Sequence, residues 1–497
     1  MTRRNLFVAL LLLIVGTAVA LQAQAQAPAP KPERVALEPQ ALASFLADQV
    51  AGRDLVGLSL AVMQDGKIVY AGGAGTASLD GNIPVTPDTR FAIGSITKQF
   101  TSASILLLVE EGRLSVTDKV AKWFPHLTSA GEITVLDLMN HVSGYPDYYP
   151  LDFVDRPMQK PIAVSALIDK WGTGKLDFAP GTRYSYSNTG FMMLGEIVSR
   201  VSGEPFAAFL QKRILEPQGL THTVFEPGDP KPPAFAQGYV TFALGPPEVA
   251  TPEGPGWVGA AGALYSTPSD LAKWDLALME GKVLKPETYT LMTSPRTLAD
   301  GTMSNYGCGL AVGTRGGQPV LGHNGAVAGF YALNNMFPRT KSALVLLSNF
   351  DSYDAVNRVY ATLAASLVPV SEPPAAKAPT EKASDKKPAG PDNVPVIAGP
   401  EAPDAARQLF LALQAGKVDR SQLGDEYNAF LSDEKIAGAS ARLKPYGTPA
   451  KVETLARNER GGMEVARTRL TFADGRILTG LMYRTPDGKV QQFFVSR

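Results

Sequence analysis

Three short segments carry side chains that together could transfer an acyl group. They are Ser95-Ile96-Thr97-Lys98, Tyr186-Ser187-Asn188 and His323-Asn324-Gly325. A serine hydroxyl is a weak nucleophile at its free pKa, so an enzyme that uses one needs a base, a proton path to the leaving group and donors for the oxyanion. The three segments contain groups that suit each of these tasks.

The serine and lysine at positions 95 and 98 are distinguished by their surroundings. The same Ser-x-x-Lys spacing begins at Ser384 and at Ser432 in polar sequence, so the spacing alone predicts nothing. Ser95 instead follows an apolar run over 91–94 and opens an apolar helical pattern. Because positions i and i+3 share a helix face, Lys98 can reach the Ser95 hydroxyl, and the helix N-terminus would favour an oxyanion there. For an isolated match, a helix cap and a solvated lysine would be the better interpretation.

Tyr186 and Asn188 follow a Pro180-Gly181 turn and precede an apolar helical pattern over 190–201, which predicts a connecting loop that faces a cleft. A tyrosine hydroxyl has an unperturbed pKa of ~10, but a neighbouring ammonium such as Lys98 would lower it. Tyr186 could then shuttle the proton. The alternatives are a half-buried aromatic for Tyr186 and a turn residue for Asn188.

His323 ends a short strand-like run over 318–321, and another strand is expected over 330–337. This pattern predicts an edge strand beside the cleft. Gly325 would let the backbone approach a substrate closely, and the N–H of Ala326 is a candidate second oxyanion donor. The other histidines are expected to be structural: His126, His141 and His222.

The ordered set Ser-x-x-Lys, Tyr-Ser-Asn and His-x-Gly resembles the serine β-lactamase and penicillin-binding-protein family. Within it, the chain looks most like the branch of class C β-lactamases, D-alanyl-D-alanine carboxypeptidases and β-lactamase-like esterases. The likeness covers residues 35 to 368 and includes the segments 91–100, 133–144, 180–195 and 259–274. It implies an α/β (α+β) sandwich, in which an antiparallel sheet is flanked by helices, and a mechanism without a cofactor or metal.

The resemblance also implies roles for individual residues. Ser95 would be the acylated nucleophile, and Lys98 would accept its proton or tune Tyr186. Tyr186 would be the base that passes the proton onward, and Asn188 would bind the amide side chain of the substrate. The substrate-binding set would then be Asn188, His323, Asn324, Gly325 and Ala326.

The segment His323-Asn324-Gly325 departs from the Lys-Thr-Gly of class C enzymes. An imidazole with an unperturbed pKa of ~6.5 is mostly neutral near pH 7, so it attracts a substrate carboxylate less than a lysine would. Efficient β-lactam hydrolysis is therefore not expected. His-x-Gly resembles the peptidase and esterase members, which implies a peptide, a D-amino-acid amide or an ester as the substrate.

Three alternatives to a peptide or amide hydrolase stay open. The first is a carboxylesterase for short acyl chains with little or no β-lactamase activity. The second is a penicillin-binding or sensor protein that is acylated and deacylates slowly, which would accumulate the covalent adduct. The third is a protein in which the motifs are relics.

The N-terminus has the pattern of a signal peptide over residues 1–27. Arg3-Arg4 precede an apolar run over 6–21, and small residues follow around Ala25 and Ala27. The run is short for a membrane-spanning helix, although an uncleaved anchor is the alternative. We therefore expect a periplasmic or secreted protein without stable membrane insertion after cleavage.

The overall composition argues against nucleic acid as a partner, and the resemblance implies a small-molecule or peptide substrate. The chain has 47 basic and 47 acidic residues. Cleavage of the predicted leader would remove two arginines and no acidic residue, which leaves a net charge of −2. The single cysteine, Cys308, is expected to be a buried thiol. No metal-ligand spacing is recognisable in the sequence. The oligomeric state is not predicted.

We expect a hydrolase domain over 28–368, a Pro/Ala/Lys-rich linker over 369–403 and a small α+β accessory domain over 404–497. In the last segment, two helical patterns are followed by four strand-like runs, the first of them over 451–456. This order resembles the cystatin-like or nuclear-transport-factor-like accessory domains. Its role could be binding, dimerisation or capping of the cleft.

Overall fold

The computed structural model describes residues 34–52, 55–368 and 394–497. The predicted signal peptide lies outside these residues, and so does the predicted linker as far as residue 393. Within the described ranges, no helix combines the length and the apolar character needed to cross a membrane.

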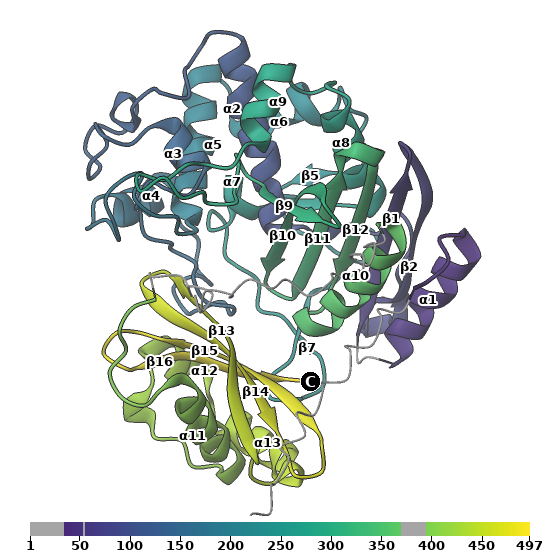
Figure 1. Cartoon of the computed structure of the whole chain (residues 1–497), viewed down its shortest axis with the longest axis vertical. Coiled ribbons are helices and arrows are strands. Elements are labelled where there is room, and N and C mark those ends of the chain that lie inside the picture. The colour runs from purple at the N-terminus through teal and green to yellow at the C-terminus, as the bar shows by residue number, and fades with distance from the viewer. Residues whose placement is uncertain (1–33, 53–54, 369–393) are drawn as a thin grey trace, which may run out of the picture.

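The larger domain is built on a seven-stranded antiparallel sheet (Figure 1). Strand β1 comes from the start of the domain and β12 from its end, and they pair in the middle of the sheet with Leu60 opposite Leu346. The sheet is therefore assembled from both ends of the domain. The strands, in spatial order, are β3 (Ile83–Pro84), β2 (Lys67–Ser78), β1 (Gly57–Gln64), β12 (Ser342–Ser348), β11 (Phe330–Phe337), β10 (Gln318–Val327) and β9 (Ala311–Arg315).

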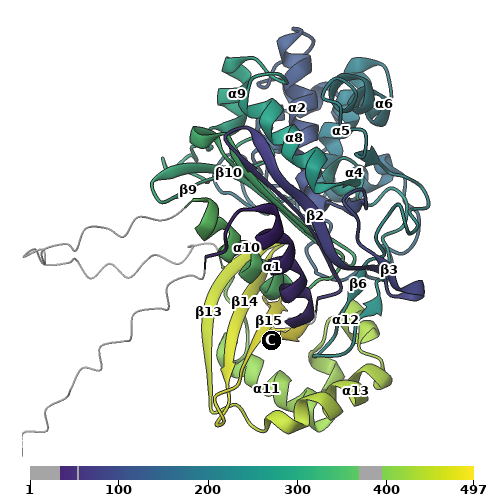
Figure 2. The ribbon, with the colours of Figure 1, turned by 90° about the vertical axis from the view of Figure 1, so that its right-hand side faces the viewer.

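Helices cover both faces of this sheet, as Figure 2 shows. One face packs against α1 (Pro39–Gly52) and α10 (Tyr353–Leu367), and its core includes Leu46 and Val359. The other face carries a larger group: α2 (Thr97–Glu110), α5 (Asn188–Ser202), α8 (Pro268–Met279) and α9 (Pro286–Thr293). Every residue of β12 is buried because both of its faces are covered, as expected for a central strand. The predicted sandwich is confirmed.

Shorter elements complete the larger domain. They include α3 (Val135–Met139), α4 (Val164–Gly172), α6 (Phe206–Leu210) and α7 (Gly259–Gly262). A small sheet of β4 (Phe91–Ala92), β8 (Leu264–Ser266) and β5 (Val224–Phe225) lies beside a pair formed by β6 (Tyr239–Val240) and β7 (Glu248–Val249). Strand β4 leads directly to Ser95 and thus fixes one end of the nucleophile turn.

The C-terminal domain is built around a second apolar cluster, which also includes Phe242 and Ala243 of the larger domain, and it has the predicted order of helices followed by an antiparallel meander. Its elements are α11 (Ala402–Ala415), α12 (Asp425–Phe430), α13 (Asp433–Leu443), β13 (Lys451–Arg460), β14 (Met463–Thr471), β15 (Ile477–Arg484) and β16 (Val490–Ser496). The prediction ended the first strand at residue 456, whereas β13 continues to Arg460. The last residues of β13 are polar, so alternation of apolar residues could not show that the strand extends to the Gly461-Gly462 turn.

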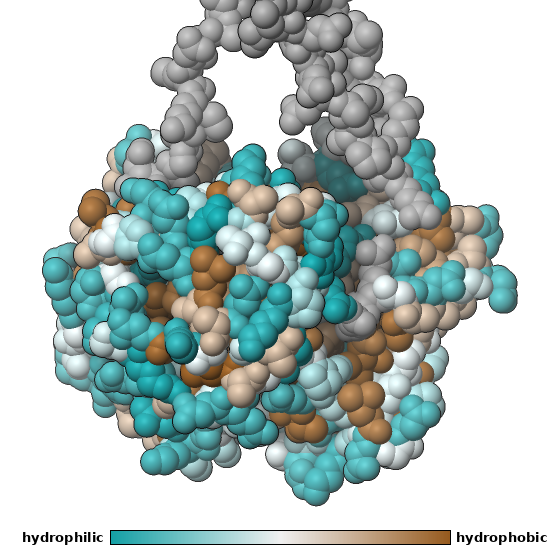
Figure 3. Space-filling model, turned by 90° about the horizontal axis from the view of Figure 1, so that it is seen from below, coloured by the Kyte–Doolittle hydropathy of each residue, from teal (hydrophilic) through white to brown (hydrophobic). Residues whose placement is uncertain are grey.

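The C-terminal domain contacts the larger domain below the ends of β10 and β11 (Figure 1). Arg442 donates to the carbonyl oxygens of Phe242 at 3.0 Å and Ala243 at 2.9 Å. Gln492 exchanges two hydrogen bonds with Asp152, at 2.7 and 2.8 Å. Seen from the end that bears this domain, the surface is mainly hydrophilic with small apolar patches (Figure 3). The two domains are thus joined by polar contacts and by the burial of Phe242 and Ala243 in the core of the C-terminal domain.

Candidate active site

Ser95 lies in a 3-10 turn, Gly94–Ile96, that leads into α2 at Thr97. Gly94 has a positive φ of 50°, and a Cβ there would lie 2.7 Å from the amide nitrogen of Ala326. A Cβ on Gly325 would lie 1.9 Å from the carbonyl oxygen of Ile93 and 3.0 Å from the amide nitrogen of Ser95. The two glycines therefore permit β10 to approach the nucleophile turn, which brings the Ser95 and Ala326 amides close together.

Lys98 is wholly buried beside the nucleophile. Its Nζ lies 3.0 Å from Ser95 Oγ and donates to Asn188 Oδ1 at 2.7 Å and to the carbonyl oxygen of Ala261, in α7, at 2.8 Å. Burial holds the pKa of Lys98 well below its usual value, although Asp147 opposes this shift. A neutral amine has two N–H groups and one lone pair. With both N–H groups used by Asn188 and Ala261, the lone pair is left for the hydroxyl of Ser95.

The hydroxyl of Tyr186 donates to Ser95 Oγ at 2.7 Å. Burial raises the pKa of Tyr186, and the hydrogen bond to Ser95 opposes this shift only in part. The expected lowering of this pKa by Lys98 is therefore wrong, because the phenol is buried and burial also favours the uncharged form of the lysine. Tyr186 is thus a protonated donor to Ser95 and not a phenolate base.

Asn188 is the first residue of α5, whereas the sequence placed it on the preceding loop. Its side chain lies between Lys98 and Asp147: Nδ2 donates to Asp147 Oδ1 at 2.9 Å, and its backbone N–H donates to the same oxygen at 3.1 Å. The side chain of Asp147 is fully buried. Sequence reasoning did not identify Asp147, because one aspartate in a loop rich in tyrosine and proline carries no spacing signal.

His323 lies where β10 becomes the edge of the sheet, because β9 pairs only with Gln318 to Gly322. Its Nε2 is 2.8 Å from the hydroxyl of Tyr306, and its Nδ1 contacts the carbonyl oxygen of Asn324. Burial, together with the nearby Lys98, lowers the pKa of His323 to about 3. The imidazole is therefore neutral near pH 7 and offers no positive charge to a substrate carboxylate.

His141 packs against Tyr186, a neighbour of Ser95. Its ring centroid is 4.2 Å from that of Tyr186, and its Nδ1 accepts the N–H of Ser187 at 3.1 Å. Burial lowers its pKa, so it is a neutral support for the tyrosine loop. His126, which was expected to be structural, pairs with Asp169 at the surface. Cys308 is buried, as expected.

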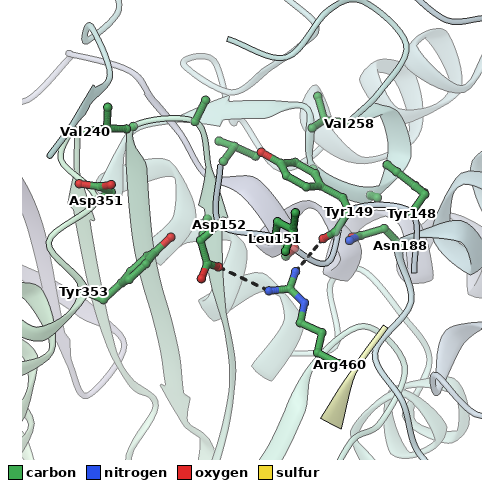
Figure 4. A pocket seen from close by; sticks show the side chains of 17 residues that line it. Tyr148, Tyr149, Leu151, Asp152, Asn188, Val240, Val258, Asp351, Tyr353 and Arg460 are labelled. Carbon is green, nitrogen blue, oxygen red and sulfur yellow. Dashed lines mark hydrogen bonds and ion pairs between the residues drawn. The ribbon is translucent and has the colours of Figure 1, made fainter. Parts of the chain in front are cut away.

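A pocket opens beside Ser95 (Figure 4). Of the predicted residues, Ser95, Asn188 and Ala326 line it, whereas Lys98, Tyr186, His323, Asn324 and Gly325 do not. Most of the polar lining was not predicted: Tyr149, Asp152, Asp351, Tyr353 and Arg460. Burial raises the pKa of Asp351 to about 7. The pocket is therefore lined by two carboxyl groups, of Asp152 and Asp351, together with one guanidinium.

Arg460 reaches this pocket from β13 of the C-terminal domain (Figure 4). It donates to the carbonyl oxygen of Tyr149 at 2.8 Å and lies 3.6 Å from a carboxylate oxygen of Asp152 and of Asp147. Sequence reasoning found no catalytic set in this domain. No local pattern marked Arg460, because its neighbours in the site lie hundreds of residues earlier in the chain.

Comparison with known proteins agrees with this architecture. The family model described as Beta-lactamase matches residues 42–368. A putative penicillin-binding protein, PbpX, of Bacillus subtilis (strain 168) is 28% identical over 300 residues, which cover 60% of this chain and 72% of that protein. The D-aminopeptidase of Gluconobacter oxydans (strain 621H) is 29% identical over 334 residues, 65% of this chain but only 61% of that enzyme. The structure of D-amino acid amidase from Ochrobactrum anthropi SV3 with D-phenylalanine superposes with a TM-score of 0.56 at 28% identity, covering 64% of this chain and 96% of that one.

Proposed function

We propose that this chain, which belongs to the beta-lactamase family of serine hydrolases, hydrolyses an amide or ester bond through an acyl-enzyme on Ser95. The observation that supports this most directly is that two catalytic groups lie within hydrogen-bond distance of Ser95 Oγ. Lys98 Nζ lies 3.0 Å from it and the Tyr186 hydroxyl 2.7 Å from it, at the wall of an open pocket. This arrangement supplies a base and a hydrogen-bond donor to one nucleophile.

Lys98 acts as the base in the acylation step. In its neutral form, the amine accepts the Ser95 proton while Oγ forms a bond to the substrate carbonyl carbon, and the electrons of the C=O bond move to the oxygen. The N–H groups of Ser95 and Ala326 stabilise this oxyanion, since the close approach at Gly94 and Gly325 brings the two amides together.

Collapse of the tetrahedral intermediate breaks the bond to the leaving group. The Lys98 ammonium returns the proton that it took from Ser95: the Tyr186 hydroxyl passes a proton to the leaving nitrogen or oxygen and is reprotonated by Lys98, since both groups lie beside Ser95 Oγ. Water then attacks the acyl carbon with neutral Lys98 again as the base, the bond from that carbon to Ser95 Oγ breaks, and the Lys98 ammonium returns a proton to Oγ.

The substrate class that fits the pocket is an amide or short peptide of a D-amino acid with a free amino group. Two of the similar proteins are a D-aminopeptidase and a D-amino acid amidase. The neutral His323 does not offer the charge that would hold a β-lactam carboxylate. Asp351 instead gives the pocket a carboxyl group that suits a substrate ammonium, whereas Asp152 already faces Arg460. We further propose export through the signal peptide at residues 1–27.

The test is intact-mass spectrometry of the full chain with a fluorophosphonate, combined with turnover assays on D- and L-phenylalanine amide, a p-nitrophenyl ester and a penicillin. We expect one fluorophosphonate adduct, its loss in Ser95→Ala, and turnover of the D-amide above the L-amide. Ser432→Ala is the matched control, because Ser432 has the same Ser-x-x-Lys spacing but only caps α13. Turnover of the ester alone would favour the esterase, and a penicillin adduct that persists would favour the sensor. Absence of any adduct would contradict the proposal.

A further inference from the structure

Two buried charged atoms face each other where the C-terminal domain meets the active site. Asp147 Oδ2 and Arg460 Nε are 3.6 Å apart, and neither has a hydrogen-bond partner among the described residues. A buried carboxylate without a cation is strongly unfavourable, so the arginine compensates the charge of Asp147. In the described part of the chain, Arg460 is the one ion-pair partner of Asp147.

This pair begins an uninterrupted series of contacts that ends at the nucleophile. Arg460 faces Asp147, and the other oxygen of Asp147 accepts two N–H groups of Asn188 at 2.9 and 3.1 Å. Asn188 Oδ1 in turn accepts from Lys98 Nζ at 2.7 Å, and Nζ lies 3.0 Å from Ser95 Oγ. A change at Arg460 can therefore reach the base through two residues, Asp147 and Asn188.

The hairpin that carries Arg460 is itself held by the loops of the active site. Glu459 Oε2 accepts a hydrogen bond from the hydroxyl of Ser185, next to Tyr186, at 3.0 Å. At Gly461, which has a positive φ of 57°, a Cβ would lie 2.8 Å from the side chain of Pro150. The tip of the hairpin thus sits between the loop of Asp147 and the loop of Tyr186, which fixes the position of the guanidinium.

We propose that Arg460 is a positioning residue, contributed by the C-terminal domain, that compensates Asp147 and thereby keeps Asn188 and a neutral Lys98 in the arrangement that accepts the Ser95 proton. This inference rests on the proposed roles of Ser95 and Lys98. It assigns the C-terminal domain a part in the chemistry, in place of a role limited to binding or capping.

The charges around Lys98 support this role. The groups that face it are Asp147 and His141 from the loops after α3, Tyr186 from the loop before α5, His323 from β10, and Arg460 from β13. Burial keeps His141, Tyr186 and His323 uncharged near pH 7. Asp147 raises the pKa of Lys98 and Arg460 lowers it, so loss of Arg460 would leave Asp147 to favour the ammonium.

The experiment is the rate of Ser95 labelling by a fluorophosphonate between pH 5 and 10 in full-length Arg460→Met. Because labelling needs neutral Lys98, we expect the rate at pH 7 to fall by about tenfold and to recover near pH 9. Arg460→Lys keeps a positive charge and is expected to retain most of the rate at pH 7. Arg442→Met is the matched control, since Arg442 also crosses the domain interface but contacts only backbone carbonyls away from Lys98.

A second variant separates charge from folding. Asp147→Asn combined with Arg460→Met removes both charges, and we expect its pH profile to return close to that of the wild type. An equal loss of rate for Arg460→Met at every pH, or no loss at all, would overturn the inference. If the wild type itself is not labelled at Ser95, the proposed function fails instead, so the two failures are distinguishable.

Discussion

The active site receives one basic side chain from the N-terminal turn of α2 and another from the hairpin of β13 and β14, and the two have opposite surroundings. Lys98 contacts only neutral groups, namely a hydroxyl, an amide and a carbonyl oxygen, and Asp147 lies behind that amide. Arg460 lies between two carboxylates. Burial lowers the pKa of the amine, and Asp147 opposes this shift, whereas a guanidinium keeps its charge at any physiological pH. The contrast shows that surroundings decide which cation can act as a base and which only compensates charge.

The largest effect is expected from replacing the base. Lys98→Met should lower kcat/KM by about 10³-fold or more at every pH, because no other described group can accept the Ser95 proton. Lys98→Arg should be equally inactive, since a guanidinium cannot deprotonate. Steady-state kinetics of Lys98→Met, Lys98→Arg and Arg460→Lys test whether position 98 needs a base while position 460 needs only a positive charge. Activity in Lys98→Arg would show that position 98 needs only a charge.

The next effect concerns the oxyanion site. Gly325→Ala should lower kcat by about 10²-fold, because the new methyl group would collide with the carbonyl oxygen of Ile93 and push Ala326 away from Ser95. Gly313→Ala in β9 is the matched control, since a Cβ there meets nothing within 4 Å. Single-turnover acylation rates measure the effect. Equal rates in the two variants would remove Ala326 from the mechanism.

A smaller effect is expected from a buried carboxyl group that, unlike Asp147, has no ion-pair partner among the described residues. Burial raises the pKa of Asp275 to about 8, and Asn334 donates to it at 2.9 Å. Because the unfolded pKa is near 4, the folded state holds a proton that the unfolded state lacks between about pH 4 and 8. Stability is thus present at low pH and lost as the pH rises, by at most about 1.4 kcal/mol per unit.

Asp275→Asn should therefore flatten the pH dependence of stability over this range. Urea unfolding at pH 5, 6.5 and 8 measures it for both proteins. A wild-type midpoint that does not change between pH 5 and 8 would show that Asp275 is charged in the folded state and compensated.

The smallest effect is expected at a surface pair. His126 and Asp169 are 2.7 Å apart, but both side chains are 55% exposed. His126→Gln should leave the melting temperature within about 2 °C of the wild type and the labelling rate unchanged, because exposed pairs contribute little. A thermal scan beside Asp275→Asn would show whether burial, rather than charge pairing alone, determines the effect.

Sequence reasoning identified the parts of the site that are local in the chain. Ser95 and Lys98 are three residues apart on one turn, and Gly325 and Ala326 follow His323 directly, so residue types and strand patterns sufficed. The strands that hold His323 and follow it were predicted from the same patterns of apolar residues. These features depend on short-range geometry, which the sequence displays.

The features that sequence reasoning missed depend on distant contacts. Asp147 matters because it is buried beneath Asn188, and Arg460 matters because another domain folds against that aspartate. The pKa of Tyr186 was predicted in the wrong direction, since the depth of burial is a property of the packed molecule. The residues around a motif predict neither how deeply a side chain is buried nor how two domains contact each other.

The place of Arg460 in the chain affects the order in which activity arises during synthesis. Ser95 and Lys98 leave the ribosome long before the β13 and β14 hairpin. A growing chain, or one cut between the domains, therefore contains the nucleophile and its lysine while Asp147 still lacks its counter-charge. Full reactivity of Ser95 would therefore begin only once the C-terminal domain has been made and has docked, so that Arg460 reaches Asp147.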